Sequence, residues 1–306
     1  MSMQDKALFE EIARLKTEMA NPLSENLDTM STNEVLTLIN SQDALVPAAV
    51  ARVLDRVEAV VKACVASIEA GGRVVYIGAG TSGRLGILDA AETWPTFSVP
   101  PGTFVGLIAG GKDAVFVAKE FAEDQKGAAV EDLKSVHLNR VDTVVGLSAS
   151  GRTPYVIEGL QHAKKIGCST GLITTNPKKS WPEFVDQVVC VDVGPEVIAG
   201  STRMKSALAQ MMILHMISTA TMVATGRVYG NLMVDVHATT RKTTQRAVRI
   251  IMLLTGLEYD QALRSLRRAR GSAKLAVLMV KKGIDLQSAQ GLLQKHKGSL
   301  RAALEE

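Results

Sequence analysis

Short runs of β-branched and apolar residues alternate with longer amphipathic stretches from residue 73 onward. Five of these runs are apolar enough to be covered on both faces, at residues 73–77, 103–108, 143–147, 170–173 and 188–193. Alternation of such runs with helical patterns is typical of parallel strands joined by crossover helices. The pattern predicts an α/β fold in which a five-stranded parallel sheet forms a doubly wound sandwich.

Two long helical patterns flank this region. Residues 47–69 carry apolar side chains at three- and four-residue steps up to Gly71 and Gly72, which predicts one continuous helix. Residues 204–224 are apolar nearly all round. A helix of that kind is buried in the interior or at a subunit interface, so we expect a homodimer.

Beyond Gly256 the periodic segments shorten to 259–270, 273–281 and 286–294. They predict a small three-helix (UBA-like) C-terminal domain over residues 256–306, after a main domain over residues 1–255. Residues 241–306 hold 14 Lys and Arg against 5 Asp and Glu. A nucleic-acid face is one interpretation of this charge, but no binding motif accompanies it, and a solvated helical face is favoured.

Composition narrows the class of protein. The 306 residues are 46% hydrophobic, enough for a sizeable core, and the 3 cysteines are widely spaced, which indicates reduced thiols rather than a disulfide framework. The 5 histidines are equally scattered, so we expect no metal site. The N-terminus is charged and helix-like without an apolar core segment, and no run approaches the length of a membrane span. Export is therefore not expected.

A glycine-rich loop follows the first predicted strand. It contains Gly80, Thr81, Ser82 and Gly83 and leads directly into a helix. Backbone N–H groups and the helix dipole at such a turn favour an anion.

The third predicted strand leads into a similar loop. Ser148, Ser150, Gly151, Arg152 and Thr153 precede a proline that suits the first turn of a helix. Ligands bind open parallel sheets at the carboxyl ends of the strands, where the strand order reverses, so the two loops are expected to converge on one group.

The spacing of Gly78, Gly80 and Gly83 also fits a dinucleotide site. The acidic residue that should then bind a ribose is missing, since the next strand ends in Ile108, Ala109 and Gly110. Hydroxyl side chains can surround the three terminal oxygens of a phosphomonoester. The sequence therefore favours a sugar phosphate over a dinucleotide.

A third polar stretch opens the apolar helix at residue 204 and contains Ser201 and Arg203. Ser201 or Thr202 can be the helix N-cap. Cations at a helix N-terminus are unfavourable, so a bound anion or a carboxylate such as Glu196 would offset their charge.

Glu92 and Glu123 are the candidate catalytic residues. Each lies on a predicted helix beside the phosphate-binding end of the sheet, where a pair of carboxylates can serve as base and acid. Burial of Glu92 beside Trp94 and Phe97 is expected to keep it protonated. Spacing alone does not select these residues over Glu120, Asp124 or Asp89.

With these motifs in view, the chain closely resembles the N-acetylmuramic acid 6-phosphate etherases. The resemblance rests on nine segments in order, at residues 18–22, 27–34, 78–86, 89–97, 108–111, 122–124, 148–156, 200–203 and 229–235. It implies a sugar isomerase (SIS) type sandwich, a homodimer without metal or organic cofactor, and cytoplasmic cell-wall recycling in bacteria. It implies catalysis by Glu92 and Glu123, and phosphate binding by Ser82, Ser148, Ser150 and Thr153.

The resemblance implies that a phosphorylated amino sugar is the substrate and that its D-lactyl ether is cleaved by elimination and hydration. A non-catalytic sugar-phosphate sensor of the glucokinase-regulatory-protein type and a phosphosugar isomerase stay open as alternatives, since both would use the same loops. The regulators typically contain two tandem sandwich domains, whereas this chain has room for one.

Overall fold

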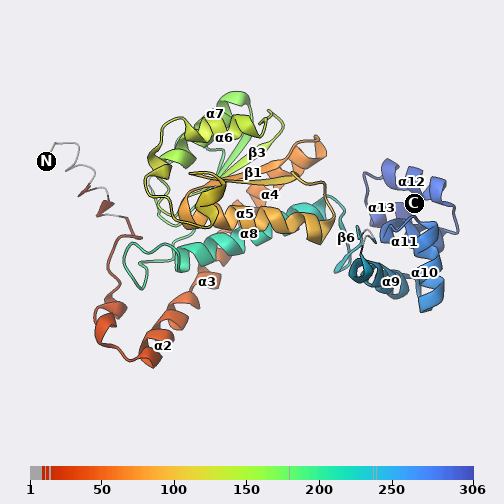
Figure 1. Cartoon of the computed structure of the whole chain (residues 1–306), viewed down its shortest axis with the longest axis horizontal. Coiled ribbons are helices and arrows are strands. Elements are labelled where there is room, and N and C mark those ends of the chain that lie inside the picture. The colour runs from red at the N-terminus through yellow and green to blue at the C-terminus, as the bar shows by residue number, and fades with distance from the viewer. Residues whose placement is uncertain (1–8, 11, 14, 179, 237, 239) are drawn as a thin grey trace. The chain divides into compact units, whose positions relative to one another are not determined.

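The structure is a computed structural model that describes residues 9–306 except 11, 14, 179, 237 and 239 (Figure 1). The chain divides into two compact units, Met1–Ala91 with Gly102–Ser218 and Glu92–Pro101 with Thr219–Glu306. Of the expected N-terminal helical stretch, residues 1–8, 11 and 14 lie outside the described residues.

The first unit is built on a parallel sheet of five strands, β1 Val74–Gly78, β2 Phe104–Ile108, β3 Thr143–Leu147, β4 Ser169–Thr174 and β5 Gln187–Cys190. Their order is β2-β1-β3-β4-β5, and every neighbouring pair is parallel. The predicted sheet is confirmed. Because the order reverses between β1 and β3, the ligand-binding crevice of such a sheet is expected at the carboxyl ends of these two strands.

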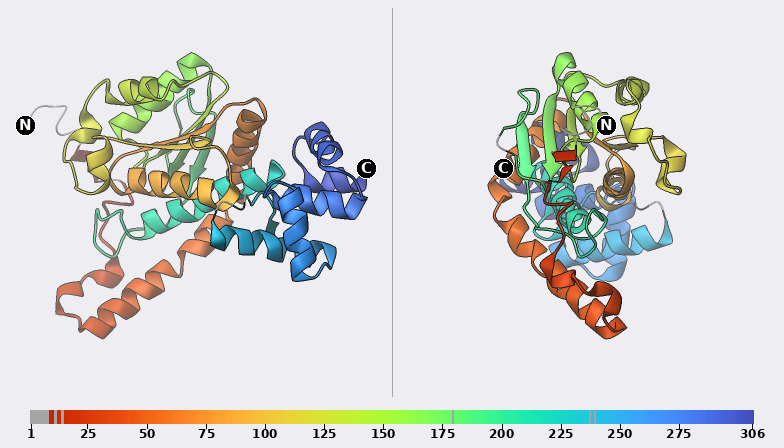
Figure 2. Two further views of the ribbon diagram at one scale, coloured as in Figure 1. Left: turned by 45° about the vertical axis from the view of Figure 1, so that its right-hand side comes forward. Right: turned by 90° about the vertical axis from the view of Figure 1, so that its left-hand side faces the viewer.

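Helices cover both faces of the sheet (Figure 2). The helices of this unit are α2 Thr32–Asp43, α3 Val46–Ala51, α4 Leu54–Glu69, α5 Gly80–Phe97, α6 Ala128–Ser135, α7 Pro154–Ile166 and α8 Lys205–Ala224, of which α5 and α8 continue into the second unit. Leu133 of α6 and Leu160 of α7 pack with Val75 and Leu172 on one face. On the other face, a side chain at Gly86 of α5 would meet Cβ of Tyr76 at 3.1 Å.

The prediction of one continuous helix over residues 47–69 is wrong in one respect, because the structure has two helices there, α3 and α4. Val53 has φ −122° and ψ 15°, outside the helical region. The N–H groups of Arg52 and Val53 bond three residues back, to Ala49 and Val50. The turn ends α3 before α4 begins, and each helix buries apolar residues of its own, Val46 and Val50 in α3 and Val57 and Val60 in α4.

Helix α8 is long and apolar enough to pass for a membrane span by length and composition, contrary to the expectation that no run approaches that length. Half of this stretch is buried inside the protein. Ile213, Leu214 and Ile217 are fully covered by other parts of the chain. The helix therefore behaves as a core helix, as its apolar pattern predicts.

The second unit contains a helical cluster with α9 Arg241–Thr255, α10 Tyr259–Arg268, α11 Ala273–Lys282, α12 Leu286–Lys295 and α13 Leu300–Glu305, and a hairpin of β6 Val228–Tyr229 and β7 Leu232–Met233. The three predicted helices are present as α10, α11 and α12. Val248 and Ile251 of α9 share their core with Val277 and Leu300. The predicted boundary near residue 256 falls at the end of α9, inside this cluster.

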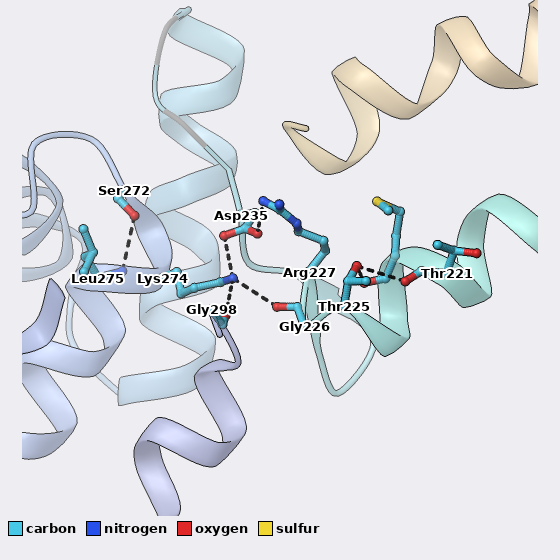
Figure 3. Close-up of polar contacts among 10 residues, drawn as sticks. Thr221, Thr225, Gly226, Arg227, Asp235, Ser272, Lys274, Leu275 and Gly298 are labelled. Atoms are coloured by element: carbon cyan, nitrogen blue, oxygen red, sulfur yellow. Dashed lines mark hydrogen bonds and ion pairs between the residues drawn. The ribbon is translucent and has the colours of Figure 1, made fainter. Parts of the chain in front are cut away.

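A buried lysine holds the hairpin region to these helices (Figure 3). The Lys274 ammonium pairs with Asp235 at 2.6 Å and donates to the carbonyls of Gly226 at 3.0 Å and Gly298 at 2.8 Å. Arg227 pairs with the other oxygen of Asp235 at 2.9 Å. Burial lowers the pKa of Lys274, but its three acceptors satisfy all three N–H donors. The contacts make Lys274 a structural residue.

Candidate active site

The loop after β1 is packed too closely to admit a side chain at Gly83. A Cβ at Gly83 would lie 2.6 Å from Cγ1 of Ile108 and 2.8 Å from the oxygen of Gly78. Gly80 has φ +53° and begins α5. The glycines thus bring the start of α5 against β1 and β2, and Thr81 and Ser82 lie half-buried on its first turn.

The loop after β3 is held by its own hydroxyls. Oγ of Ser148 lies 2.7 Å from Oγ1 of Thr153 and accepts from the Thr153 N–H at 3.4 Å. Oγ of Ser150 lies 3.4 Å from Oγ of Ser148 and accepts from the Arg152 N–H. The three hydroxyls predicted in this loop are therefore grouped together, ahead of the first turn of α7.

Gly151 allows this loop its sharp turn. Its φ is +67°, and a Cβ there would lie 2.8 Å from Oγ1 of Thr174. Its carbonyl accepts from Nζ of Lys178 at 3.0 Å. A larger residue would strain the backbone and clash with β4.

Both loops leave the sheet at the same edge. Gly78 at the end of β1 pairs in register with Leu147 at the end of β3. Since these strands are parallel neighbours, the loops that follow them are adjacent at the reversal of strand order. The expected convergence of the two loops thus has its basis in the topology.

The segment after β2 closes the other side of the β1 loop. Gly110 has φ +87°, and a Cβ there would meet Cβ of Ala122 at 3.1 Å. Its carbonyl accepts from Nζ of Lys119 at 2.9 Å. Phe121 has a left-handed backbone, φ 63°, directly before the 3-10 helix η4 Ala122–Asp124. These turns fold the segment back towards the start of α5.

A cavity of about 390 Å³ lies between this segment and α5. The residues that give it chemical character are Gly80, Arg84, Lys119, Glu120, Glu123 and Asp124. Glu123 therefore shares a cavity with the start of α5. Burial of the carboxyl and the neighbouring charge of Asp124 raise the pKa of Glu123 above its usual range. Although Glu123 is open to solvent on one side, the wall of the cavity shifts the balance towards the protonated form.

Glu92 lies elsewhere on α5. It is about 18 Å along the helix axis from Gly80, farther than a glutamate side chain reaches. It is exposed in this chain, and Trp94 is 59% exposed. The expectation that Trp94 buries Glu92 is thus wrong for a single chain, because both side chains are exposed to solvent.

In the third polar loop, a carboxylate caps α8. Glu196 is fully buried and accepts from the N–H groups of Lys205 at 3.0 Å and Ser206 at 2.9 Å. It therefore offsets the charge of Lys205, as the sequence suggested. Arg203 is exposed and Ser201 half-buried.

Two parts of the site were not singled out from the sequence. Arg84 reaches the cavity from α5 and bonds to the segment after β2. Thr17 is buried and exchanges hydrogen bonds with Asn176, whose amide also donates to the carbonyl of Ala149 at 3.0 Å. The position of Arg84 one residue after the glycine loop is a signal that was available. Among the described residues no three His, Cys, Asp or Glu are grouped to hold a metal ion.

Comparisons with known proteins identify the fold and the family of the chain. The family described as glucokinase regulatory protein N-terminal SIS domain matches residues 56–164, and the SIS domain family matches residues 127–220. A solved structure of a protein from Bacteroides fragilis NCTC 9343 has TM-score 0.50 and 22% identity over 66% of this chain and 95% of that one. It supports the SIS-type fold.

Two curated relatives cover nearly the whole chain. An N-acetylmuramic acid 6-phosphate etherase from Histophilus somni (strain 129Pt) is 46% identical over 99% of this chain and 100% of its own length. Another, from Geobacillus sp. (strain WCH70), is 48% identical over 96% of this chain and 100% of its own. At this identity and coverage, the chain belongs to the N-acetylmuramic acid 6-phosphate etherase family.

Proposed function

We propose that the protein is a lyase that cleaves the D-lactyl ether of N-acetylmuramic acid 6-phosphate, giving N-acetylglucosamine 6-phosphate and D-lactate. The family supports this reaction. The observation that carries the proposal is the cavity in which the start of α5 meets the carboxyl of Glu123. The same proposal includes a role in cell-wall recycling in the bacterial cytoplasm.

The phosphate is bound by the two hydroxyl loops. Ser82 on the first turn of α5 and the group of Ser148, Ser150 and Thr153 contribute hydroxyl donors. Backbone N–H groups at the starts of α5 and α7 add the positive end of a helix dipole. Gly151, Arg152, Ser201 and Arg203 are proposed to complete the binding of the sugar.

Elimination needs an acidic proton beside the ether carbon. Opening of the sugar ring exposes the C1 aldehyde, which acidifies the proton on C2. Glu123 removes this proton, and its raised pKa brings the carboxylate nearer to the pH at which a general base works well. The electron pair left on C2 expels lactate from C3, and a double bond forms between C2 and C3.

Glu92 donates a proton to the departing lactate oxygen. It then removes a proton from the water that attacks C3, while Glu123 returns its proton to C2. Atoms and protons balance without a metal ion or an organic cofactor. Each proton transfer contributes ~10²–10⁴-fold to the rate.

A homodimer would bring the second glutamate to the cavity. Within one chain Glu92 lies about 18 Å along α5 from the phosphate loop. Glu92 is exposed on α5, so in a dimer a partner subunit can reach it. The proposed active site therefore pairs Glu123 of one subunit with Glu92 of the partner subunit.

A sugar-phosphate sensor is the second candidate, because the family described for glucokinase regulatory protein matches residues 56–164. A sensor would bind the sugar phosphate and release nothing. An isomerase would release a ketose instead of lactate.

Incubation with N-acetylmuramic acid 6-phosphate, followed by an assay for D-lactate, separates the three. The lyase releases D-lactate in amounts equal to the N-acetylglucosamine 6-phosphate formed, and E123Q releases none. Binding without D-lactate would contradict the proposal.

A further inference from the structure

Arg84 lies on the second turn of α5 and lines the cavity that holds Glu123. Its Nε donates to the carbonyl of Val115 at 2.8 Å, and its Nη2 donates to the carbonyl of Ala114 at 2.7 Å. Two bonds to successive carbonyls fix the plane of the guanidinium. The side chain is half-buried, so its orientation does not depend on a flexible surface contact.

These two bonds use two of the five N–H donors of the guanidinium. Within the described part of the chain the other three donors have no hydrogen-bond acceptor, and no carboxylate pairs with Arg84. Lys119, the other cation of the cavity, is by contrast paired with Asp113 at 3.4 Å. Arg84 therefore brings a positive charge without a close ion pair, and a fixed set of donors, to the cavity.

The strand order shows on which side of the phosphate this charge lies. The hydroxyl group around Ser148 follows β3, whereas the segment held by Arg84 follows β2, and β1 lies between the two strands. A sugar whose phosphate lies between the loops after β1 and β3 has its opposite end free to extend towards β2. At that end the proposed substrate carries its second anion, the carboxylate of the lactyl group.

We propose that Arg84 binds the lactyl carboxylate and so selects the muramic acid over other amino-sugar phosphates. The inference rests on the proposed function. A planar guanidinium matches a carboxylate in two parallel hydrogen bonds, which fix its orientation as well as its charge. The bound carboxylate would hold the ether oxygen in place for elimination, and it stays bound as lactate departs.

The test compares two ligands that differ by the lactyl group alone, N-acetylmuramic acid 6-phosphate and N-acetylglucosamine 6-phosphate. Their affinities are measured by calorimetry in E123Q, which blocks turnover, with and without R84Q. We expect R84Q to weaken binding of the muramic acid by roughly 10–100-fold, the range for a hydrogen-bonded charge, and binding of the glucosamine by less than about threefold. R84K keeps the charge but lacks the planar pair of donors. We expect its affinity for the muramic acid to lie between those of Arg84 and R84Q.

The glucosamine also reports on the integrity of the cavity. An equal loss of affinity for both ligands would mean that Arg84 binds the phosphate or supports the fold, and it would overturn the inference. Unchanged affinity for both ligands would overturn it as well. K119Q removes the other cation of the cavity and is expected to leave the affinity ratio unchanged.

The D-lactate assay on the wild-type chain is scored separately. If D-lactate is released but R84Q leaves the affinity ratio of the two sugars unchanged, this inference is overturned and the proposed function stands. A ratio that depends on Arg84 without release of D-lactate supports carboxylate binding and overturns the lyase. Failure of the wild type to bind either sugar overturns both.

Discussion

Gly80, the first residue of α5, and Glu123, which follows β2, line one cavity. The two residues belong to loops that follow neighbouring parallel strands. One loop offers backbone donors for an anion and the other a carboxyl with a raised pKa. The arrangement joins a candidate phosphate-binding turn to a candidate base, which is the combination that elimination from a sugar phosphate requires.

Hydration after elimination predicts where oxygen from solvent appears. In ¹⁸O-labelled water, the hydroxyl at C3 of N-acetylglucosamine 6-phosphate should carry the label, because the C3–O bond breaks and water replaces lactate. Mass spectrometry of the sugar and of D-lactate locates the isotope. Label in the lactate instead, with an unlabelled sugar, would mean that the bond on the lactyl side of the ether breaks.

Subunit exchange tests whether the two glutamates come from different chains. E92Q and E123Q homodimers should each be inactive, whereas co-expression should restore about one quarter of wild-type activity. Half of randomly mixed dimers are mixed, and each of these has one intact site. D-lactate release from co-purified dimers carrying two different tags is the measurement.

A matched control co-expresses E123Q with the double variant E92Q/E123Q, in which no site recovers both glutamates. Mixed dimers as inactive as their parents would show that both glutamates act from the same chain.

S148A should weaken phosphate binding. Ser148 is buried and its hydroxyl organises Ser150 and Thr153, so its loss removes one donor and loosens two others. We expect kcat/KM to fall roughly 10–100-fold, the range for one hydrogen bond to a charged group. The control is S135A, whose exposed hydroxyl donates to the carbonyl of Asp132 and whose activity should be unchanged.

Asp89 should make stability depend on pH. It is buried on α5, where its Oδ1 accepts from Ser218 at 3.0 Å, and burial raises its pKa from 3.8 to about 6. Since the folded chain binds this proton more tightly than the unfolded chain, the stabilisation is complete below pH 3.8 and is lost as the pH rises through about 6.

D89N keeps an acceptor for Ser218 and removes the titration. Relative to wild type, its free energy of unfolding should therefore rise by about 2–3 kcal/mol between pH 4 and pH 7. Urea unfolding at several pH values measures the difference. The control is D55N, which changes an exposed aspartate. Its free energy of unfolding relative to wild type should not change across the same pH range.

E196A should destabilise the chain. Glu196 caps the first turn of α8 and lies beside the buried ammonium of Lys205. Removing it leaves two buried N–H groups without an acceptor and one carboxylate fewer near the Lys205 ammonium, at about 2–6 kcal/mol of unfolding free energy. S201A, which alters the hydroxyl first considered as the cap, should change stability by less than about 0.5 kcal/mol. A similar loss in both variants would contradict the capping role of Glu196.

The sequence by itself determined the sheet and its loops. Strand β3 agrees with its predicted range, and the glycine loop leads directly into α5. Both features could be predicted because strands of β-branched residues and glycine turns are specified by residues close together in the sequence. The break between α3 and α4 could not be predicted in this way. The 3.6-residue apolar pattern continues through the break, so the sequence shows no sign of the turn at residues 52–53.

Only the tertiary structure decided which residues share the cavity. Arg84 bonds to carbonyls of residues 114 and 115, and Gly110 packs against Ala122, contacts that depend on strand order and on the path of the segment after β2. For the same reason the sequence marked Glu92 and Glu123 alike, while the fold separates Glu92 from its own phosphate loop along α5. Local patterns specify elements, whereas a site forms from side chains that the topology brings together across long stretches of chain.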